Sequence, residues 1–324
     1  MHLTTRQLFI SQVVLLSGCG SQAVFAKSAP SATVSLSYIA RLYSMAMATS
    51  GKRVVIKNKW NTIEVETNSR RAWVNGTMVW LHHPCRKSGS GWALREVDFK
   101  KGIDPILRSY AFLPSKTPRV VVLDPGHGGK DSGAVGKRKV YEKLAVLSIA
   151  KRVKAHLEAK QIQVRMTRST DTFIPLEKRS EFAAKAGADL FVSIHADGAG
   201  DPSAHGVETF AMTAAGGDSS NYYGQGGDKS PGKGNRHDAA NAVLGFSLQS
   251  NLVKTSKRSD RGLRRARFSV LKNAPCPAAL VECGFLTNPE EEALMIDANY
   301  REAVARGISN GILGYITLAG RVRK

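Results

Sequence analysis

The sequence predicts an α/β fold in which a single mixed β-sheet is flanked by helices and preceded by a small β-rich module. Two patterns lead to this expectation. From residue 118 to the C-terminus, apolar β-branched runs alternate with segments of helical periodicity. Residues 38–113 instead hold short strand-like runs separated by turn signals. A chain of 324 residues with 42% apolar content has room for one large and one small globular unit.

Residues 1–26 have the features of an export signal. Arg6 supplies a positive charge, and the apolar run from Leu8 to Leu16 is too short to span a bilayer. Two cleavage sites remain open. The sequence LSGC resembles a lipobox and would make Cys19 a lipid-anchored N-terminus, whereas VFA, which ends at Ala26, suits ordinary signal peptidase. We therefore expect an exported protein of the periplasm or cell envelope, with or without a lipid on Cys19.

Residues 27–37 are small and polar and are expected to form a tether. In the module that follows, 53–56 and 62–67 are strand-like, and Asn75-Gly76 predicts a hairpin within residues 71–81. The stretch 98–113 is compatible with a helix. His82, His83 and Cys85 lie close together, but adjacent strand residues point to opposite faces, so a solvated histidine pair is favoured over a metal site.

A linker at 114–117 leads into the large domain, 118–324. Its predicted strands are 120–124, 163–168, 190–195, 207–212 and 278–283. Its predicted helices run from Glu142 to about residue 160, follow Pro175, and include Leu244, Leu248 and Leu252; two more begin at Asn288-Pro289 and at a capping box of Asn299 and Glu302.

Two polar stretches interrupt this alternation. Thr213 to Asn235 is rich in Gly, Ser, Asn and Lys, and we expect an exposed, mobile insertion there. The basic run from Lys254 to Arg267 is interpreted as a solvated helix face, with contact to an acidic substrate as the alternative. The net charge of +21 predicts attraction to polyanions, but no nucleic-acid-binding motif accompanies it, so nucleic acid is not an expected partner.

The cysteines beyond Cys19 are Cys85, Cys276 and Cys283. An extended strand between the last two would separate their Cα atoms by about 23 Å, whereas a disulfide needs about 4.4–6.8 Å. We predict no bond between them. The sequence contains no CxxC motif, so a cysteine zinc site is not expected.

Four residues that can carry chemistry fall at predicted strand ends or helix starts, where one edge of the sheet can gather them. His127 follows the first strand in a Gly-rich loop, Glu142 opens a helix, His195 ends a strand and Glu282 lies in the last strand. Two imidazoles and a carboxylate are the ligands of many catalytic zinc sites, which also need a glutamate for proton transfer. The HExxH motif is absent, so spacing alone does not identify these ligands.

Five blocks, in order, carry a resemblance to a known family. They are LDPGHGGKDSGAVG at 123–136, YEK at 141–143, TRSTDTFIPLEKRSEFAAKAGADLFVSIHADG at 167–198, GVETF at 206–210 and FSVLKNAPCPAALVECGFLTNPEE at 268–291. The large domain thereby resembles the zinc-dependent N-acetylmuramoyl-L-alanine amidases of bacterial cell-wall turnover. The small module resembles the β-rich domain first named from the N-terminus of copper amine oxidases.

The resemblance implies an enzyme that hydrolyses the amide between N-acetylmuramic acid and L-alanine in peptidoglycan or muropeptides. It implies one Zn²⁺ held by His127, Glu142 and His195, with Glu282 as the catalytic glutamate. Cys283 is expected to pack on the opposite face of the strand, and Arg168 and Arg179 to be structural. Glu208 is open between a structural role and orienting the site.

Two alternatives to this enzyme remain at this point. The fold could serve an inactive wall-binding protein, although all four site residues are present, or a zinc peptidase that cuts within the stem peptide. Members of the family can carry an inserted helix that blocks the metal. Residues 213–235 stand at a comparable place but lack apolar residues, so an open site, or one gated by this loop, is expected. The sequence sets no oligomeric state.

Overall fold

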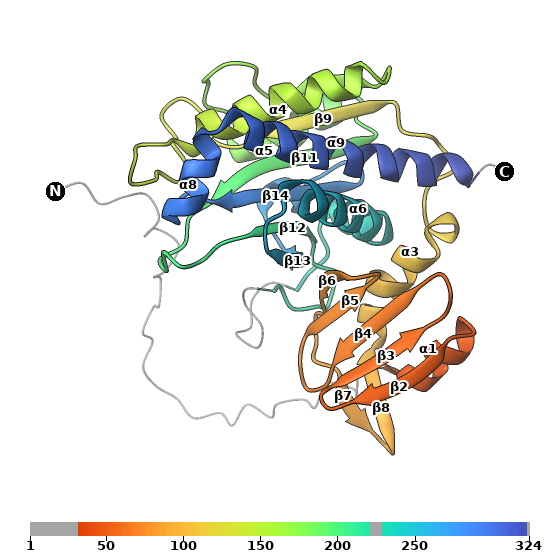
Figure 1. The fold of residues 1–324 in the computed structure, drawn as a ribbon. Helices are drawn as coiled ribbons and strands as arrows, with labels where there is room; N and C mark the ends of the chain where they lie inside the picture. The colour runs from red at the N-terminus through yellow and green to blue at the C-terminus, as the bar shows by residue number, and fades with distance from the viewer. Residues whose placement is uncertain (1–31, 221–228, 323–324) are drawn as a thin grey trace, which may run out of the picture. The chain divides into compact units, whose positions relative to one another are not determined.

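One 11-stranded β-sheet connects the two halves of the chain, as Figure 1 shows for the described residues, 32–220 and 229–322, of this computed structural model. The predicted signal peptide, both cleavage sites and the first part of the tether lie outside the described residues. The strand order is β10-β9-β11-β14-β12-β13-β6-β5-β4-β3-β2. The bounds are β2 (Ala46–Ser50), β3 (Arg53–Lys57), β4 (Thr62–Glu66), β5 (Arg71–Val74), β6 (Thr77–Trp80), β9 (Val120–Pro125), β10 (Gln163–Met166), β11 (Leu190–Asp197), β12 (Val207–Met212), β13 (Asp260–Ala266) and β14 (Ala278–Phe285).

The C-terminal half of this sheet, β9 to β14, is mixed, as predicted. Strands β10, β9, β11 and β14 are parallel, β12 is antiparallel to β14, and β13 is parallel to β12. Every residue of β12 and β14 is buried. Strands covered on both faces read as continuous apolar runs, which explains why these segments were recognisable from the sequence.

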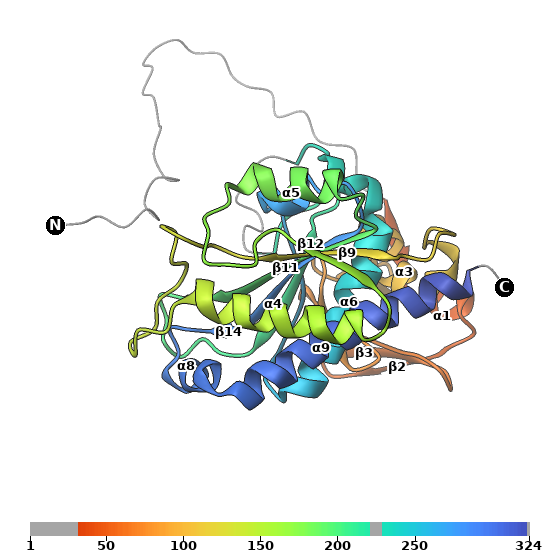
Figure 2. The same ribbon diagram turned by 90° about the horizontal axis from the view of Figure 1, so that it is seen from above.

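Helices cover both faces of this C-terminal half (Figure 2). On one face lie α4 (Glu142–Glu158), α6 (Asp238–Ser256) and α9 (Ala298–Arg321), and on the other lie α5 (Leu176–Lys185) and α7 (Ser269–Lys272). The side chains of α4 predicted to share one side, Val146, Ile149, Val153 and Leu157, are all fully buried. Burial of such a stripe supplies most of the stability of a surface helix.

The last two helices begin at side-chain caps. Asn288 accepts hydrogen bonds from the backbone of Glu290 and Glu291 at the start of α8 (Pro289–Ile296), as predicted. The predicted capping box of Asn299 and Glu302 is wrong: Asp297 caps α9 by accepting from the backbone of Asn299. Glu302 instead contacts Arg152 and His156 of α4.

The N-terminal β-rich region starts earlier than predicted. Residues 33–37, expected to be tether, form β1 (Thr33–Ser35) and the start of α1 (Leu36–Leu42), whose N-cap is Ser35. Strand β1 pairs with β8 (Gly91–Arg95), which pairs with β7 (Arg86–Ser88) in a three-stranded antiparallel sheet. The predicted hairpin is present as β5 and β6. Residues 96–111 are helical, in the short segments α2 (Glu96–Asp98), η1 (Phe99–Ile103), α3 (Asp104–Leu107) and η2 (Ser109–Ala111).

The sheet of this region continues into that of the C-terminal half, because β6 pairs with β13. Side chains support the junction: Asp260 accepts a hydrogen bond from the backbone of Met78, and the Trp80 indole donates to the carbonyl of Arg261. The apolar core of the N-terminal region also includes Ala211 and Leu263 of β12 and β13. From Ala32 on, the chain forms one compact unit.

The basic run was wrongly interpreted as a solvated helix face. Helix α6 ends at Ser256, and the chain then enters β13, in which Arg265 is buried. Burial lowers the pKa of the Arg265 guanidinium, and the charges of Asp238 and Asp98 partly offset this effect. The run thus forms part of the sheet that joins the two halves.

The prediction of a solvated histidine pair was also wrong for His82. His82 is buried, and its Nδ1 atom lies 2.9 Å from Oδ1 of Asp98. Its Nε2 atom accepts a hydrogen bond from the backbone of Ala214. His83 is half-buried and donates its backbone N–H to Asp98. His82 therefore forms a structural contact between the N-terminal region and the loop after β12.

The stretch from Thr213 to Asn235 is not uniformly exposed. Thr213, Ala214 and Asp218 are buried, and Arg70 donates to the carbonyls of Ser219 and Ser220. A 3-10 helix, η3 (Lys233–His237), closes the segment. Residues 221–228 lie outside the described part, so the prediction of an open or loop-gated site stays a prediction.

Replacing Asp98 by alanine is expected to destabilise the junction. The buried carboxylate accepts from the backbone N–H groups of His82 and His83 and from the His82 ring, and its removal leaves these groups without that acceptor. We expect a loss of about 3 kcal/mol in the free energy of unfolding, measured by urea denaturation. Glu96→Ala, which removes a surface contact to Lys100, is the control. A loss below about 1 kcal/mol for Asp98→Ala would contradict this account.

Cys85, Cys276 and Cys283 are all free and buried, which confirms that Cys276 and Cys283 are not bonded. Burial raises the pKa of the Cys276 thiol to about 12 and that of Cys85 to about 11, so neither is a reactive thiolate at neutral pH. Within the part of the chain that is described, no helix is long and apolar enough to cross a membrane.

Candidate active site

The loop after β9 holds His127 at the carboxyl end of the central strands. Its backbone has a φ of 59°, a left-handed conformation that is uncommon for residues other than glycine. Two buried arginines hold the loop in this shape. Arg179 donates to the carbonyl of His127 at 2.9 Å and to Oδ1 of Asp124 at 2.8 Å, and Arg168 donates to the carbonyls of Pro125 and Gly126. Both arginines therefore have the structural role expected of them.

The His127 ring is oriented by an acid that the sequence reasoning missed. Nδ1 lies 2.8 Å from Oδ2 of Asp131, and Nε2 lies 3.0 Å from Oε1 of Glu142. Burial lowers the pKa of His127, but hydrogen bonds to Glu142 and Asp131 outweigh burial and raise it above the usual value. When Nδ1–H donates to Asp131, the lone pair of Nε2 is available to a metal.

Glu142 is the first residue of α4, where the helix dipole favours a negative charge. Its buried carboxylate accepts from the backbone N–H groups of Ala134 at 2.7 Å and Ala196 at 3.0 Å. Burial alone would raise the pKa of this carboxyl, but hydrogen bonds from His127 and His195 outweigh burial and hold its pKa well below the usual value. Glu142 is therefore a fixed carboxylate anion at neutral pH, with oxygen atoms that can bind a metal ion.

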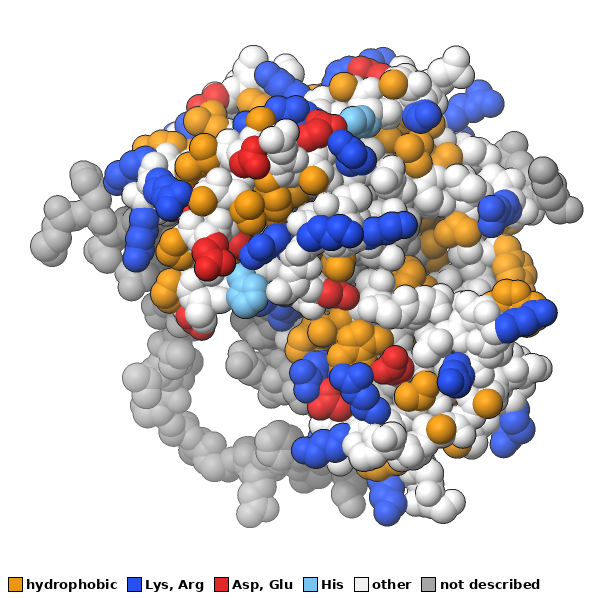
Figure 3. All heavy atoms as spheres, viewed as in Figure 1, with side chains coloured by type: hydrophobic (Ala, Val, Ile, Leu, Met, Phe, Trp, Pro, Cys, Tyr) orange, Lys and Arg blue, Asp and Glu red, His pale blue; other side chains and the backbone are white. Residues whose placement is uncertain are grey.

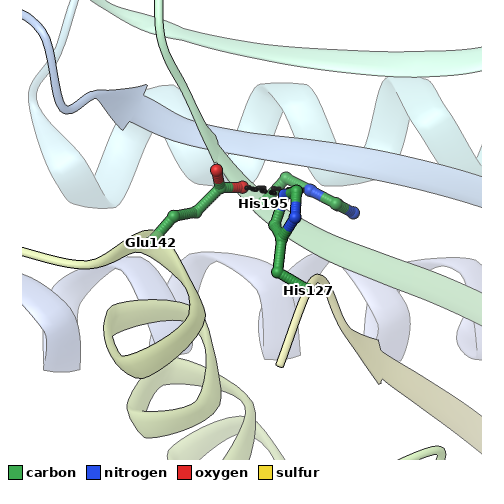
Figure 4. Close-up of side chains that lie close together, drawn as sticks. All are labelled: His127, Glu142 and His195. Atoms are coloured by element: carbon green, nitrogen blue, oxygen red, sulfur yellow. Dashed lines mark hydrogen bonds and ion pairs between the residues drawn. The ribbon is translucent and has the colours of Figure 1, made fainter. Parts of the chain in front are cut away.

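His195 completes the group from β11. Its Nδ1 atom lies 3.0 Å from Oε1 of Glu142, and Figure 4 shows the carboxylate directed at the two imidazoles. Glycines make room for this arrangement. A Cβ at Gly126 would lie 2.2 Å from Cε1 of His195, and one at Gly133 would lie 2.5 Å from Oε2 of Glu142. Alanine at either position would displace a ring or a carboxylate.

The three side chains fit a divalent metal. One donor atom from each of His127, Glu142 and His195 lies within 4.8 Å of the others, and no other such group of His, Cys, Asp or Glu occurs among the described residues. Ligand atoms on a tetrahedral ion with bonds of about 2.0–2.1 Å lie about 3.3 Å apart, so only small side-chain shifts are needed. Two nitrogen donors and one oxygen donor suit a first-row transition metal.

Glu282 lies beside this group in β14. It stands directly opposite His195 on β11 and Glu208 on β12, so the three side chains share one face of the sheet. Its side chain is mostly buried, with 8% of the residue exposed. Cys283 points to the other face and is fully buried, as predicted.

Glu208 is held by two arginines of the misinterpreted basic run. Its Oε2 atom accepts from Nε of Arg261 at 2.8 Å and from Nη1 of Arg264 at 2.7 Å. These contacts give Glu208 a structural role next to Glu282.

Asp131 could have been suspected from its position four residues after His127, but that spacing by itself does not show that the chain turns back to the imidazole.

The sequence profile of the N-acetylmuramoyl-L-alanine amidase family Amidase_3 matches residues 121–314. The chain belongs to this family. AmiA of Escherichia coli K12, an N-acetylmuramoyl-L-alanine amidase, is 42% identical over 219 residues, which cover 61% of this chain and 76% of AmiA. The probable cell wall amidase LytH of Staphylococcus epidermidis is 28% identical over 278 residues, 85% of this chain and 78% of LytH.

Solved structures of amidases are also similar to this chain. The amidase from Clostridium difficile 630 superposes with a TM-score of 0.54 at 35% identity, covering 62% of this chain and 98% of that one. The catalytic domain of the amidase CwlV from Paenibacillus polymyxa gives 0.52 at 34% identity, covering 62% of this chain and 99% of that domain. The family resemblance predicted from the sequence blocks is thus confirmed, and the chain is a peptidoglycan amidase, a hydrolase.

Proposed function

We propose that this amidase is zinc-dependent and cleaves the bond between the lactyl group of N-acetylmuramic acid and L-alanine. In this proposal His127, Glu142 and His195 hold the ion, and Glu282 transfers protons. The observation that carries the proposal is the gathering of the three donors within 4.8 Å of one another. They come from the loop after β9, the start of α4, and β11, the strand that pairs with that of Glu282.

The residues around the site support a metal that keeps one open position. Three protein ligands are the number found in catalytic zinc sites, in which water takes the fourth place. Zinc bound there would acidify a water molecule and polarise the scissile carbonyl. The chain's own part is to fix the donors: Asp131 orients His127, and the backbone N–H groups of Ala134 and Ala196 orient Glu142.

Proton transfer is the role proposed for Glu282. We assign it to accept a proton from the attacking water and then to deliver that proton to the departing amine of L-alanine. Its position opposite His195 on the neighbouring strand puts a carboxylate beside the ligand group. Its mostly buried surroundings also limit competing water.

Export is part of the same proposal, because the substrate lies outside the cytoplasm. The N-terminal signal leaves two mature forms open, one beginning at a lipid-bearing Cys19 and one following Ala26. The mass of the mature N-terminal peptide separates the two. The net charge of +21 favours attraction to the carboxylates of stem peptides.

Product analysis tests the reaction. Purified sacculi treated with the enzyme should release intact stem peptides that begin with L-alanine, identified by mass spectrometry. Peptides cut within the stem would support the alternative of a zinc peptidase. Binding to sacculi without any release would support the alternative of an inactive wall-binding protein.

A further prediction concerns Asp131, the acid that contacts Nδ1 of His127. Asp131→Asn should lower zinc affinity by about 10–100-fold, as measured by competition with a chelating dye, because an amide no longer holds the imidazole in one tautomer. Excess zinc should restore much of the hydrolysis. Glu181→Gln, at an exposed position on α5, is the control. Unchanged zinc affinity in Asp131→Asn would show that this acid does not support the site.

A further inference from the structure

The sheet face that carries Glu282 continues beyond the catalytic half of the chain. His195, Glu282 and Glu208 stand opposite one another on β11, β14 and β12. The next strands are β13 and β6, where Leu263 pairs with Val79 and both point into the apolar core. Their neighbours Arg264 and Trp80 therefore point to the face of Glu282.

Contacts between side chains confirm this continuity. The guanidinium of Arg264 donates to Glu208 and lies 5.2 Å from the ring centroid of Trp80. Arg261 also donates to Glu208, and its backbone carbonyl accepts from the Trp80 indole. A connected set of contacts thus leads from the strand beside that of Glu282 to β6, the strand of the N-terminal region that pairs with β13.

The face extends onto β5 and β4. Trp73 stands opposite Met78 on β6 and Glu64 on β4, and Arg71 stands opposite Trp80. Trp73, Met78 and Trp80 are half-buried, whereas the residues that alternate with them, such as Ala72 and Val79, are fully buried. Figure 3 shows apolar side chains gathered over β5 and β6, with basic and acidic groups around them.

Charges on this face are nearly balanced. Arg53 pairs with Glu64 at 3.1 Å, and Arg71 pairs with Glu66 at 2.7 Å. Glu208 is shared by Arg261 and Arg264. Although the whole chain carries a net charge of +21, most of these arginines are matched by acids. A polyanion is bound by unmatched cations, so nucleic acid does not fit this face.

We propose that this surface, the tryptophan face, binds the glycan strand of peptidoglycan. We define it as Trp73, Trp80, Arg71, Arg261 and Arg264. The assignment rests on the proposed function, because the substrate must reach Glu282. Neighbouring strands lie about 4.7–4.9 Å apart, so Trp80 is about 14 Å and Trp73 about 19 Å from the strand of Glu282. The tryptophan face therefore begins on β13, two strands from the strand of Glu282, and leads away from it.

The chemistry of the tryptophan face suits a sugar chain. A flat indole offers apolar area to the C–H face of a sugar ring at little cost in conformational entropy. Guanidinium groups and carboxylates around it offer planar hydrogen-bonding groups to hydroxyl and acetamido groups. The two indoles are held in place, Trp73 by Arg53 at 4.6 Å from its ring and Trp80 by its bond to Arg261. A preformed surface of this kind binds without ordering itself first.

The first test compares substrates of different glycan length. Trp73→Ala should reduce kcat/KM on intact sacculi at least fivefold more than on a soluble muropeptide with a single disaccharide, with the larger part in KM. Trp73 is chosen because it lies farthest from Glu282 along this face. Trp60→Ala, which removes an indole that is 71% exposed in the same region, is the matched control and should leave both substrates unaffected. Equal losses on both substrates, or no loss on sacculi, would overturn the proposal.

The second test does not depend on hydrolysis. An oligomer of β-1,4-linked N-acetylglucosamine, which has no stem peptide and no carboxylate, should bind the full chain in calorimetry, and Trp73→Ala and Trp80→Phe should weaken that binding. Binding of a free stem peptide that is sensitive to Trp73→Ala, with none of the oligomer, would overturn the glycan assignment. If the oligomer binds but the wild-type enzyme does not cleave sacculi, the proposed function fails while the tryptophan face stands.

Discussion

Glu282→Gln is expected to keep its zinc and to lose hydrolysis of peptidoglycan by about 10³-fold or more, the upper part of the range for removal of a general acid–base group. The amide keeps the size and hydrogen-bonding shape of the carboxylate but neither accepts nor returns a proton. Release of dye from labelled sacculi measures the rate, and metal analysis of the same preparation measures the zinc.

Glu208→Gln is the matched control, because Glu208 lies directly opposite Glu282 on the next strand. Its carboxylate is held by Arg261 and Arg264, so we expect a much smaller loss than for Glu282→Gln. If Glu282→Gln released peptides at the wild-type rate, Glu282 would not transfer the protons. If Glu208→Gln lost as much, the loss in Glu282→Gln would not identify Glu282 as the proton-transfer group.

His195→Ala is expected to abolish both zinc binding and hydrolysis. The imidazole supplies one of three protein donors, and a site with two donors holds zinc weakly. We expect zinc affinity to fall by more than about 100-fold, beyond the effect of losing an outer-shell partner. Equilibrium dialysis against buffered zinc measures the affinity.

His156→Ala provides the comparison for this variant. His156 lies on α4 but contacts Glu302 of α9 rather than the ligand group. It should bind zinc and cleave sacculi at nearly wild-type levels. Stoichiometric zinc in His195→Ala with retained hydrolysis would remove His195 from the site.

The parts of the fold that the sequence predicted correctly depend on local patterns. The spacing of Val146, Ile149, Val153 and Leu157 defines the buried side of α4 without reference to any other segment. The run LFVSIH reads as a buried strand because β11 is covered on both faces. His127, Glu142 and His195 were identified through the blocks of the family, and the structure brings them together.

The errors concern residues whose partners are distant in the sequence. Strand β13 was missed because its arginines looked solvated, and only Glu208, more than fifty residues earlier, shows why Arg261 and Arg264 lie in a sheet. His82 was expected in solvent because nothing near it in the sequence indicates that Asp98, sixteen residues later, accepts a hydrogen bond from its ring. Tertiary contacts of this kind override local propensity.

For the same reason, the sequence did not reveal that the strands on either side of the predicted linker share one sheet. Residues 114–117 have the composition of a linker, and a linker usually separates independent domains. Strand β6 precedes these residues in the sequence and β13 follows them. The two strands pair, so the N-terminal strands extend the catalytic sheet. That pairing also gives the enzyme the tryptophan face, which no single segment of the sequence contains.

Anomalous diffraction at the zinc absorption edge, from crystals of the enzyme grown with zinc, tests the central claim most directly. The account predicts one strong peak per chain, bonded to Nε2 of His127, Nδ1 of His195 and a carboxylate oxygen of Glu142 at about 2.0–2.2 Å. A peak elsewhere, or none at this site while the enzyme remains active, would contradict it.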